Sequence, residues 1–142
     1  MIALATPMKD PHQRNNKKEV IEAWIKLQNT PQESKSHKEL FWSHVVLQEL
    51  IRDQPQKAWE LIVEILRTDA SDKILENLSA GPLEDLLVYH GGSVIDEVEA
   101  EASRNPMLRK LLGGVWRRSM GDDVWKRLLR YADRNGWNGL AR

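Results

Sequence analysis

The 142-residue sequence contains no cysteine. This absence excludes disulfides, cysteine nucleophiles and thiolate metal sites, and it fits a reducing compartment. No apolar run approaches the roughly 20 residues that a membrane-spanning helix needs. The first residues also lack the basic segment and long apolar stretch of a secretory signal. We therefore expect a cytoplasmic protein with no membrane segment.

Recognisable catalytic and metal-binding motifs are also missing. The four histidines, His12, His37, His44 and His90, include no pair spaced four apart and no HExxH motif, so we predict no metal site and no cofactor. The glycine pairs in HGGS and LLGGVW match neither GxGxxG nor a Walker loop. We expect no enzymatic activity, and an enzyme or small-ligand site around His44 or His90 is a remote alternative.

What the sequence does contain is helical periodicity. Hydrophobic residues make up 41% and charged residues 30%, as in soluble globular proteins. Apolar residues recur at helical spacing through most of the chain, and no segment alternates as a strand would. We predict a flexible arm over residues 1–15 and a single all-α domain over residues 16–142.

Residues that favour helix ends divide this domain into short helices. We predict one helix over residues 35–52, and others that begin near Pro55, Ser71, Pro82, Ser93, Asn105-Pro106 and Gly121-Asp122. Short helices with tight connections predict an irregular stack of antiparallel helix pairs that resembles HEAT repeats. A compact helical bundle is the alternative.

The stretch GPLEDLLVYHGG, residues 81–92, combines two carboxylates with a histidine and could suggest catalysis. Glu84 and His90 are six residues apart, however, so they do not share a helix face. Carboxylates near a helix N-terminus and a histidine near its C-terminus both suit the helix dipole, and Gly91 suits a left-handed helix stop. We therefore interpret the stretch as the two ends of one short helix.

Residues 55–126 resemble a known family. The shared features are GPLEDLL, a glycine after it, ID.VE..A, NP..R..L.GVW and a later VW; here they run from Gly81 through Ile95, Asn105 and Trp116 to Trp125. This pattern resembles a family of small bacterial proteins known only as a domain of unknown function. The resemblance implies a helical fold and no assigned activity.

Tryptophans and one glycine pair raise separate questions. Trp24, Trp59, Trp116 and Trp125 lie on apolar stripes, which predicts that they are core residues. Trp42 or Trp137 could instead be an exposed anchor for a partner. Gly113 and Gly114 interrupt a strong helical stripe at a cost of roughly 1–2 kcal/mol, which indicates either close helix packing or a kink at a binding groove.

Charge is unevenly distributed although the net charge is zero. Residues 1–52 carry 8 basic and 6 acidic side chains (net +2), residues 53–103 carry 3 and 12 (net −9), and residues 104–142 carry 10 and 3 (net +7). The acidic and basic segments could neutralise each other within the fold. Alternatively, one of them could form a charged face that attracts a partner.

We expect a non-enzymatic protein-interaction module, of an immunity or inhibitor type, that covers a basic site on a toxin or nuclease. Two like-charged pairs, Glu60–Glu64 and Glu97–Glu101, suit an anionic surface on neighbouring helices. The candidate partner-binding residues are Glu84, Asp85, Asp96, Glu97, Glu101, Trp42 and Trp137.

A nucleic-acid-associated protein is the main alternative. Lys126, Arg130 and Arg134 are spaced as a ladder on the last predicted helix, and Arg127 adjoins it. Such a ladder could bind phosphates. The overall pI of about 6.9 makes this alternative less favourable.

Overall fold

The structure is a computed structural model that describes residues 16–137. The predicted arm, residues 1–15, and the last residues of the predicted domain, 138–142, lie outside the described residues. Within the described residues the regular structure is helical and includes no strand, so the all-α prediction is confirmed. The helices are α1 (Lys17–Gln28), α2 (Lys35–Leu40), α3 (Trp42–Asp53), α4 (Pro55–Thr68), α5 (Asp72–Leu78), a π-helical turn η2 (Ser79–Leu83), α6 (Glu84–Ala102), α7 (Pro106–Gly113) and α8 (Asp122–Leu129).

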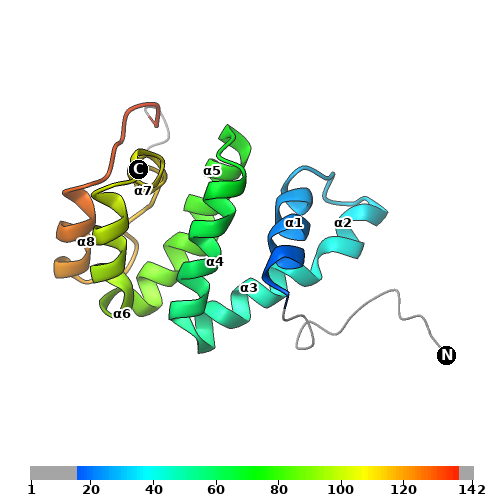
Figure 1. Ribbon diagram of the computed structural model, residues 1–142, viewed down its shortest axis with the longest axis horizontal. Coiled ribbons are helices and arrows are strands. Elements are labelled where there is room, and N and C mark those ends of the chain that lie inside the picture. Colours follow the sequence, from blue (N-terminus) through cyan, green and yellow to red (C-terminus); the bar gives the residue numbers. More distant parts are fainter. Residues whose placement is uncertain (1–15, 138–142) are drawn as a thin grey trace.

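The helices follow one another along the long axis of the molecule. Figure 1 shows α1 and α2 at one end, α4 and α5 in the middle, and α7 and α8 at the other end. The main packing partners are close in sequence, with α3 on α4, α4 on α6, and α6 on α8. This local packing resembles the stack that the sequence predicts.

Several predicted helix starts are found at the expected residues. Asn105 is the N-cap of α7, and its side-chain oxygen accepts hydrogen bonds from the backbone N–H groups of Met107 (3.0 Å) and Leu108 (3.3 Å). Pro55 occupies the first turn of α4, where a missing N–H costs nothing. Ser71 and Gly121 precede α5 and α8. These boundaries depend on local chemistry, which explains why the sequence predicts them.

The single helix predicted over residues 35–52 is wrong, because the structure divides it into α2 and α3 at Phe41. The Ser43 hydroxyl donates to the Leu40 carbonyl oxygen at 2.7 Å. The backbone N–H of His44 donates to Phe41 at 3.0 Å, which is the tighter spacing of a turn. A side-chain bond to the backbone can compete in this way with the regular helical ladder.

The prediction of separate helices from Pro82 and from Ser93 is confirmed in outline, because α6 consists of two helices that meet at a kink. The predicted boundaries differ from the observed ones, since α6 begins at Glu84. Pro82 lies inside η2, which joins α5 to α6. A kink at His90 (φ −137°, ψ 24°) takes the place of the predicted left-handed stop at Gly91. Gly91 instead allows close packing, since an added Cβ would lie 2.8 Å from a methyl carbon of Val124 in α8.

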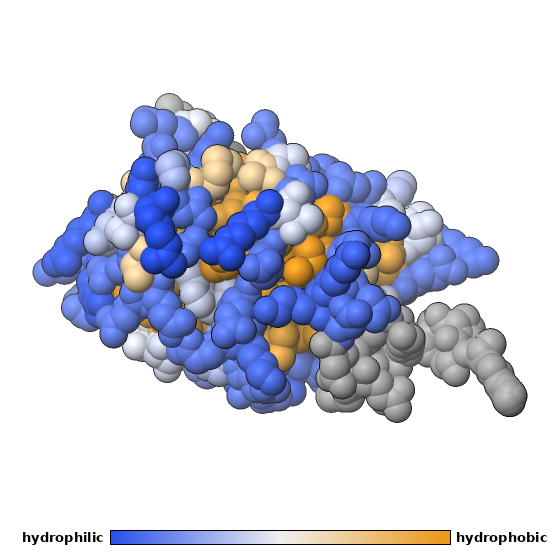
Figure 2. Space-filling model, in the orientation of Figure 1, coloured by the Kyte–Doolittle hydropathy of each residue, from blue (hydrophilic) through white to orange (hydrophobic). Residues whose placement is uncertain are grey.

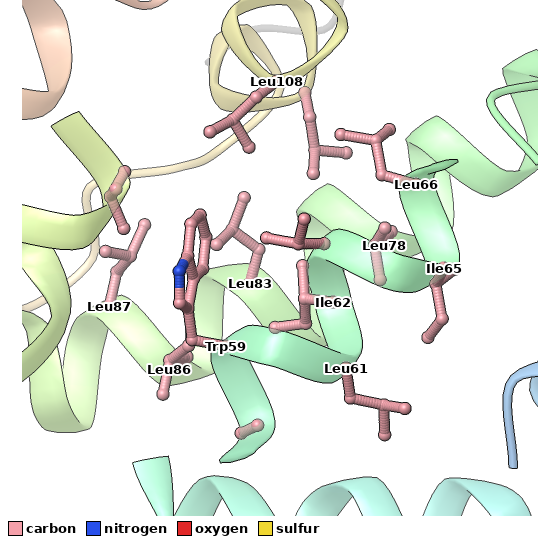
Figure 3. Packing of buried hydrophobic residues seen from close by; sticks show 14 of the residues in the cluster. Trp59, Leu61, Ile62, Ile65, Leu66, Leu78, Leu83, Leu86, Leu87 and Leu108 are labelled. Carbon is pink, nitrogen blue, oxygen red and sulfur yellow. The ribbon is translucent and has the colours of Figure 1, made fainter. Parts of the chain in front are cut away.

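The buried hydrophobic residues form one cluster to which every helix of the described part except α2 contributes. Figure 3 shows Trp59 and Ile62 of α4 facing Leu83, Leu86 and Leu87, with Leu108 of α7 closing the same space. Figure 2 shows that the outer surface is mostly hydrophilic, with apolar residues visible between the polar ones. The apolar stripes read from the sequence therefore converge on a common core.

The glycine pair that ends α7 provides space for Trp137. The indole N–H of Trp137 donates to the Lys110 carbonyl oxygen at 3.0 Å. A Cβ at Gly114 would lie 2.6 Å from the indole ring, and a Cβ at Gly113 would overlap the backbone carbonyl oxygen of Asp133. Of the two alternatives, close packing is therefore the correct one. The prediction that Trp137 is an exposed anchor is wrong, because the residue is only 8% exposed.

We expect Gly113→Ala to lower the free energy of unfolding by about 2 kcal/mol or more, because backbone atoms of residue 133 cannot move aside as a flexible side chain could. Urea unfolding measures the change. Gly92→Ala is the matched control, since nothing lies within 4 Å of its Cβ position and alanine favours a helix more than glycine does. Equal effects of the two substitutions would contradict the close-packing explanation.

Candidate functional site

The predicted acidic residues at the start of α6 are engaged within the fold. Glu84 is only 6% exposed, and its carboxylate accepts the backbone N–H of Trp116 at 3.0 Å. Asp85 accepts from the guanidinium of Arg118 at 2.7 Å, and Arg118 also lies 3.5 Å from Glu84. These bonds use both carboxylates to hold the loop after α7 against α6, with Glu84 buried and Asp85 partly exposed.

The middle of α6 is engaged in the same way by α8. Arg127 donates to Asp96 at 2.5 Å and to Glu99 at 2.6 Å. Hydrogen bonding and charge from Arg127 hold the pKa of Glu99 below its ordinary value, although partial burial opposes them. The acidic and basic segments therefore neutralise each other along this part of α6, which is one of the two alternatives raised by the charge distribution.

A different group of carboxylates remains together on the surface between α4 and α6. Glu60, Glu64, Glu97 and Glu101 line one shallow hollow of about 240 Å³, with Trp59 and Val63 of α4 among its other residues. We call this the acidic hollow. The two like-charged pairs predicted from the sequence to form an anionic surface thus face a common space.

Two of these four carboxylates have no counter-ion among the described residues. Glu101 is buried and accepts from Asn105 at 2.9 Å and from Arg104 at 2.7 Å, and it also pairs with Arg67 at 3.5 Å. The hydrogen bond from Asn105, together with the two arginines, holds the pKa of Glu101 below its ordinary value although burial opposes them. Glu64 pairs with Arg67 at 2.9 Å. Glu60 and Glu97 are exposed and take part in no ion pair between described residues. The cations Lys17 and Arg67 also line the hollow.

The predicted tryptophan anchors do not form an exposed site. Trp42 is partly buried and packs against the core, and Trp137 is buried under the glycine pair. The prediction that Trp116 is a core residue is wrong, because Trp116 is 43% exposed. The apolar stripe that runs into Trp116 ends with the helix at Gly113, which explains this error.

The predicted basic ladder is not a continuous feature of one helix. Helix α8 ends at Leu129, so Arg130 and Arg134 lie beyond it. The Arg134 guanidinium lies 5.9 Å from the centre of the Trp125 ring, and Arg127 is engaged by the carboxylates of α6. Lys126 and Arg130 are exposed. The four cations therefore have separate environments.

The histidines do not form the catalytic group that the stretch GPLEDLLVYHGG, residues 81–92, could suggest. Asp85 acts electrostatically on His44 of α3, whereas His90 lies at the kink of α6. The His44 ring contacts Phe41, with ring centres 5.0 Å apart.

Among the described residues no group of three or more potential ligands could hold a metal ion. None of the described helices is long and apolar enough to span a membrane.

A second hollow lies between α3 and α6, and of its residues the sequence indicated only His90, as a remote alternative for a ligand site. Gln48, Ile51 and Arg52 line it from α3, and Tyr89 and His90 line it from α6. Its volume is about 550 Å³. Tyr89 is exposed and does not belong to the buried apolar stripe of α6. An aromatic residue outside that stripe is the feature of the sequence that could have indicated this surface.

Comparison with known proteins identifies a family. A sequence model described as a family of unknown function (DUF6869) matches residues 30–136. This match extends further toward both ends than the resemblance seen over residues 55–126. No curated protein and no solved structure matches the chain.

We expect Glu84→Ala to lower the free energy of unfolding by about 1–3 kcal/mol, because it leaves the Trp116 N–H without its acceptor. Glu84→Gln keeps an acceptor of the same shape and should recover most of the loss. Urea unfolding of both variants measures the difference. If the two variants are equally destabilised, charge and not the hydrogen bond is the important property.

His44 should make stability depend on pH. Burial lowers the pKa of His44 below 6.5, with His37 acting in the same direction and Asp85 opposing. The folded state therefore binds the proton less readily than the unfolded state, so stability is complete above about pH 6.5 and decreases as pH falls below it. Thermal unfolding of His44→Gln and the parent between neutral and mildly acidic pH tests this. A smaller decrease is expected in the variant, and parallel curves would refute it.

Proposed function

We propose that this protein, which belongs to the family of unknown function DUF6869, is a non-enzymatic protein-interaction module. Its acidic hollow would receive a basic segment of a partner protein. The observation that carries the proposal is the position of Glu60 and Glu97, which face one hollow without a counter-ion among the described residues.

The distribution of arginines supports this choice of surface. Arg118 and Arg127 neutralise the carboxylates on the side of α6 that meets the C-terminal third. At the α4–α6 hollow the same segment supplies Arg104 to the buried Glu101, while Glu60 and Glu97 take part in no ion pair between the described residues. An external cation would pair with these two carboxylates, whose neighbours Glu64 and Glu101 already have arginine partners.

The kind of partner follows from the same charges. A protein with an exposed cationic site, such as a nuclease that binds phosphates, would complement the hollow electrostatically. An immunity-type or inhibitor-type protein would cover that site and block it. We propose this role in place of nucleic-acid binding, because Arg127 is already neutralised and Arg134 is stacked near Trp125.

The charge reversal Glu60→Lys/Glu97→Lys should weaken binding of a fluorescein-labelled octalysine peptide by about tenfold, since exposed ion pairs contribute roughly 0.2–1 kcal/mol each and reversal adds repulsion. Fluorescence anisotropy measures the affinity. Binding to the parent should also weaken as salt is added.

Glu22→Lys/Glu76→Lys is the matched control, because it changes the net charge equally on exposed positions of α1 and α5 outside the hollow. It should reduce affinity much less. An equal reduction in both variants would show that the peptide responds to net charge alone, and the proposal would then fail.

A further inference from the structure

The hollow between α3 and α6 has the composition of a binding site for a different kind of segment. Its floor is the buried Ile51, and its wall carries Tyr89, which is 66% exposed. A volume of about 550 Å³ lies in the range of ligand pockets, roughly 300–1,000 Å³. An exposed tyrosine beside an apolar floor is typical of residues that dominate protein interfaces.

The cations around this hollow are already neutralised. The guanidinium of Arg52 binds the carboxylate of Asp53 through two hydrogen bonds of 2.9 Å each. Arg118 binds Asp85 at 2.7 Å. These pairs leave little net charge to attract an ion, in contrast to the acidic hollow.

Uncharged hydrogen-bonding groups remain available there. The side chains of Gln48 and His90 form no hydrogen bond or ion pair with the described residues. An amide and an imidazole offer both donors and acceptors, which can pair with the backbone or an uncharged side chain of another chain. The hollow therefore combines apolar surface, one aromatic ring and neutral polar groups.

The loop after α7 is held against α6, the helix that carries Tyr89. Arg118 has a left-handed backbone (φ 50°), which is uncommon for a residue other than glycine. Its bond to Asp85 connects the loop after α7 to α6. Such backbone geometry is often found at functional sites.

We propose that the α3–α6 hollow binds an uncharged segment of a partner protein that inserts an aromatic or aliphatic side chain. Tyr89 stacks on the inserted side chain, and Gln48 and His90 bond to polar groups beside it. This contact is independent of the acidic hollow and is insensitive to salt.

The test uses N-acetyl-tryptophanamide and N-acetyl-leucinamide as uncharged probes, with N-acetyl-lysinamide as the charged comparison. Titration of the full chain, followed by two-dimensional NMR, should shift the signals of Gln48, Ile51 and His90 for the uncharged probes. Tyr89→Ser should weaken binding of the tryptophan probe about fivefold or more, whereas Tyr89→Phe should retain most of it.

Leu129→Ser is the control, because it removes an exposed apolar side chain from α8, outside the hollow. It should leave the shifts unchanged. Shifts that are scattered over the surface, or stronger binding of the lysine probe, would overturn the proposal. Octalysine binding to Tyr89→Ser should equal that of the parent, so failure at this hollow is distinguishable from failure at the acidic one.

Discussion

The fold depends on the pairing of carboxylates on α6 with groups from the C-terminal third of the chain. Glu84 is the central member, because a buried carboxylate must have partners and its own are the Trp116 N–H and Arg118. The exposed pair of Asp96 with Arg127 contributes less, since solvent screens it. These contacts neutralise carboxylates on one side of α6, whereas Glu97, which lines the hollow that faces α4, takes part in no ion pair between the described residues.

Local features of the sequence were sufficient to predict the helical class and several boundaries. Asn105 and Pro106 form a cap whose bonds involve residues within one helical turn, so the prediction required no knowledge of distant contacts. The like-charged pairs on α4 and α6 could also be recognised in the sequence, because the two glutamates of each pair are four residues apart. Their meeting in one hollow required only that the two helices pack together, which their apolar stripes favour.

The remaining features depend on contacts between distant residues. Trp137 is buried because Gly113 and Gly114 leave space for its ring, and neither residue alone indicates this. Gly91 has the composition of a helix stop, but its place against Val124 is determined by the packing of α6 on α8. The sequence also could not show which carboxylates Arg118 and Arg127 would neutralise. Where the local sequence allowed two roles for a residue, contacts with distant parts of the chain determined which role it has in the structure.

The two hollows differ in how a partner would recognise them. An acidic surface attracts a cationic partner over a distance and accelerates encounter, whereas its exposed ion pairs add little affinity once formed. An apolar hollow with an exposed tyrosine acts only on contact, where removal of apolar surface from water stabilises the complex. A single partner that used both would be attracted by Glu60 and Glu97 and retained at Tyr89. Because α6 contributes to both hollows, the helix whose carboxylates organise the fold also connects the two surfaces.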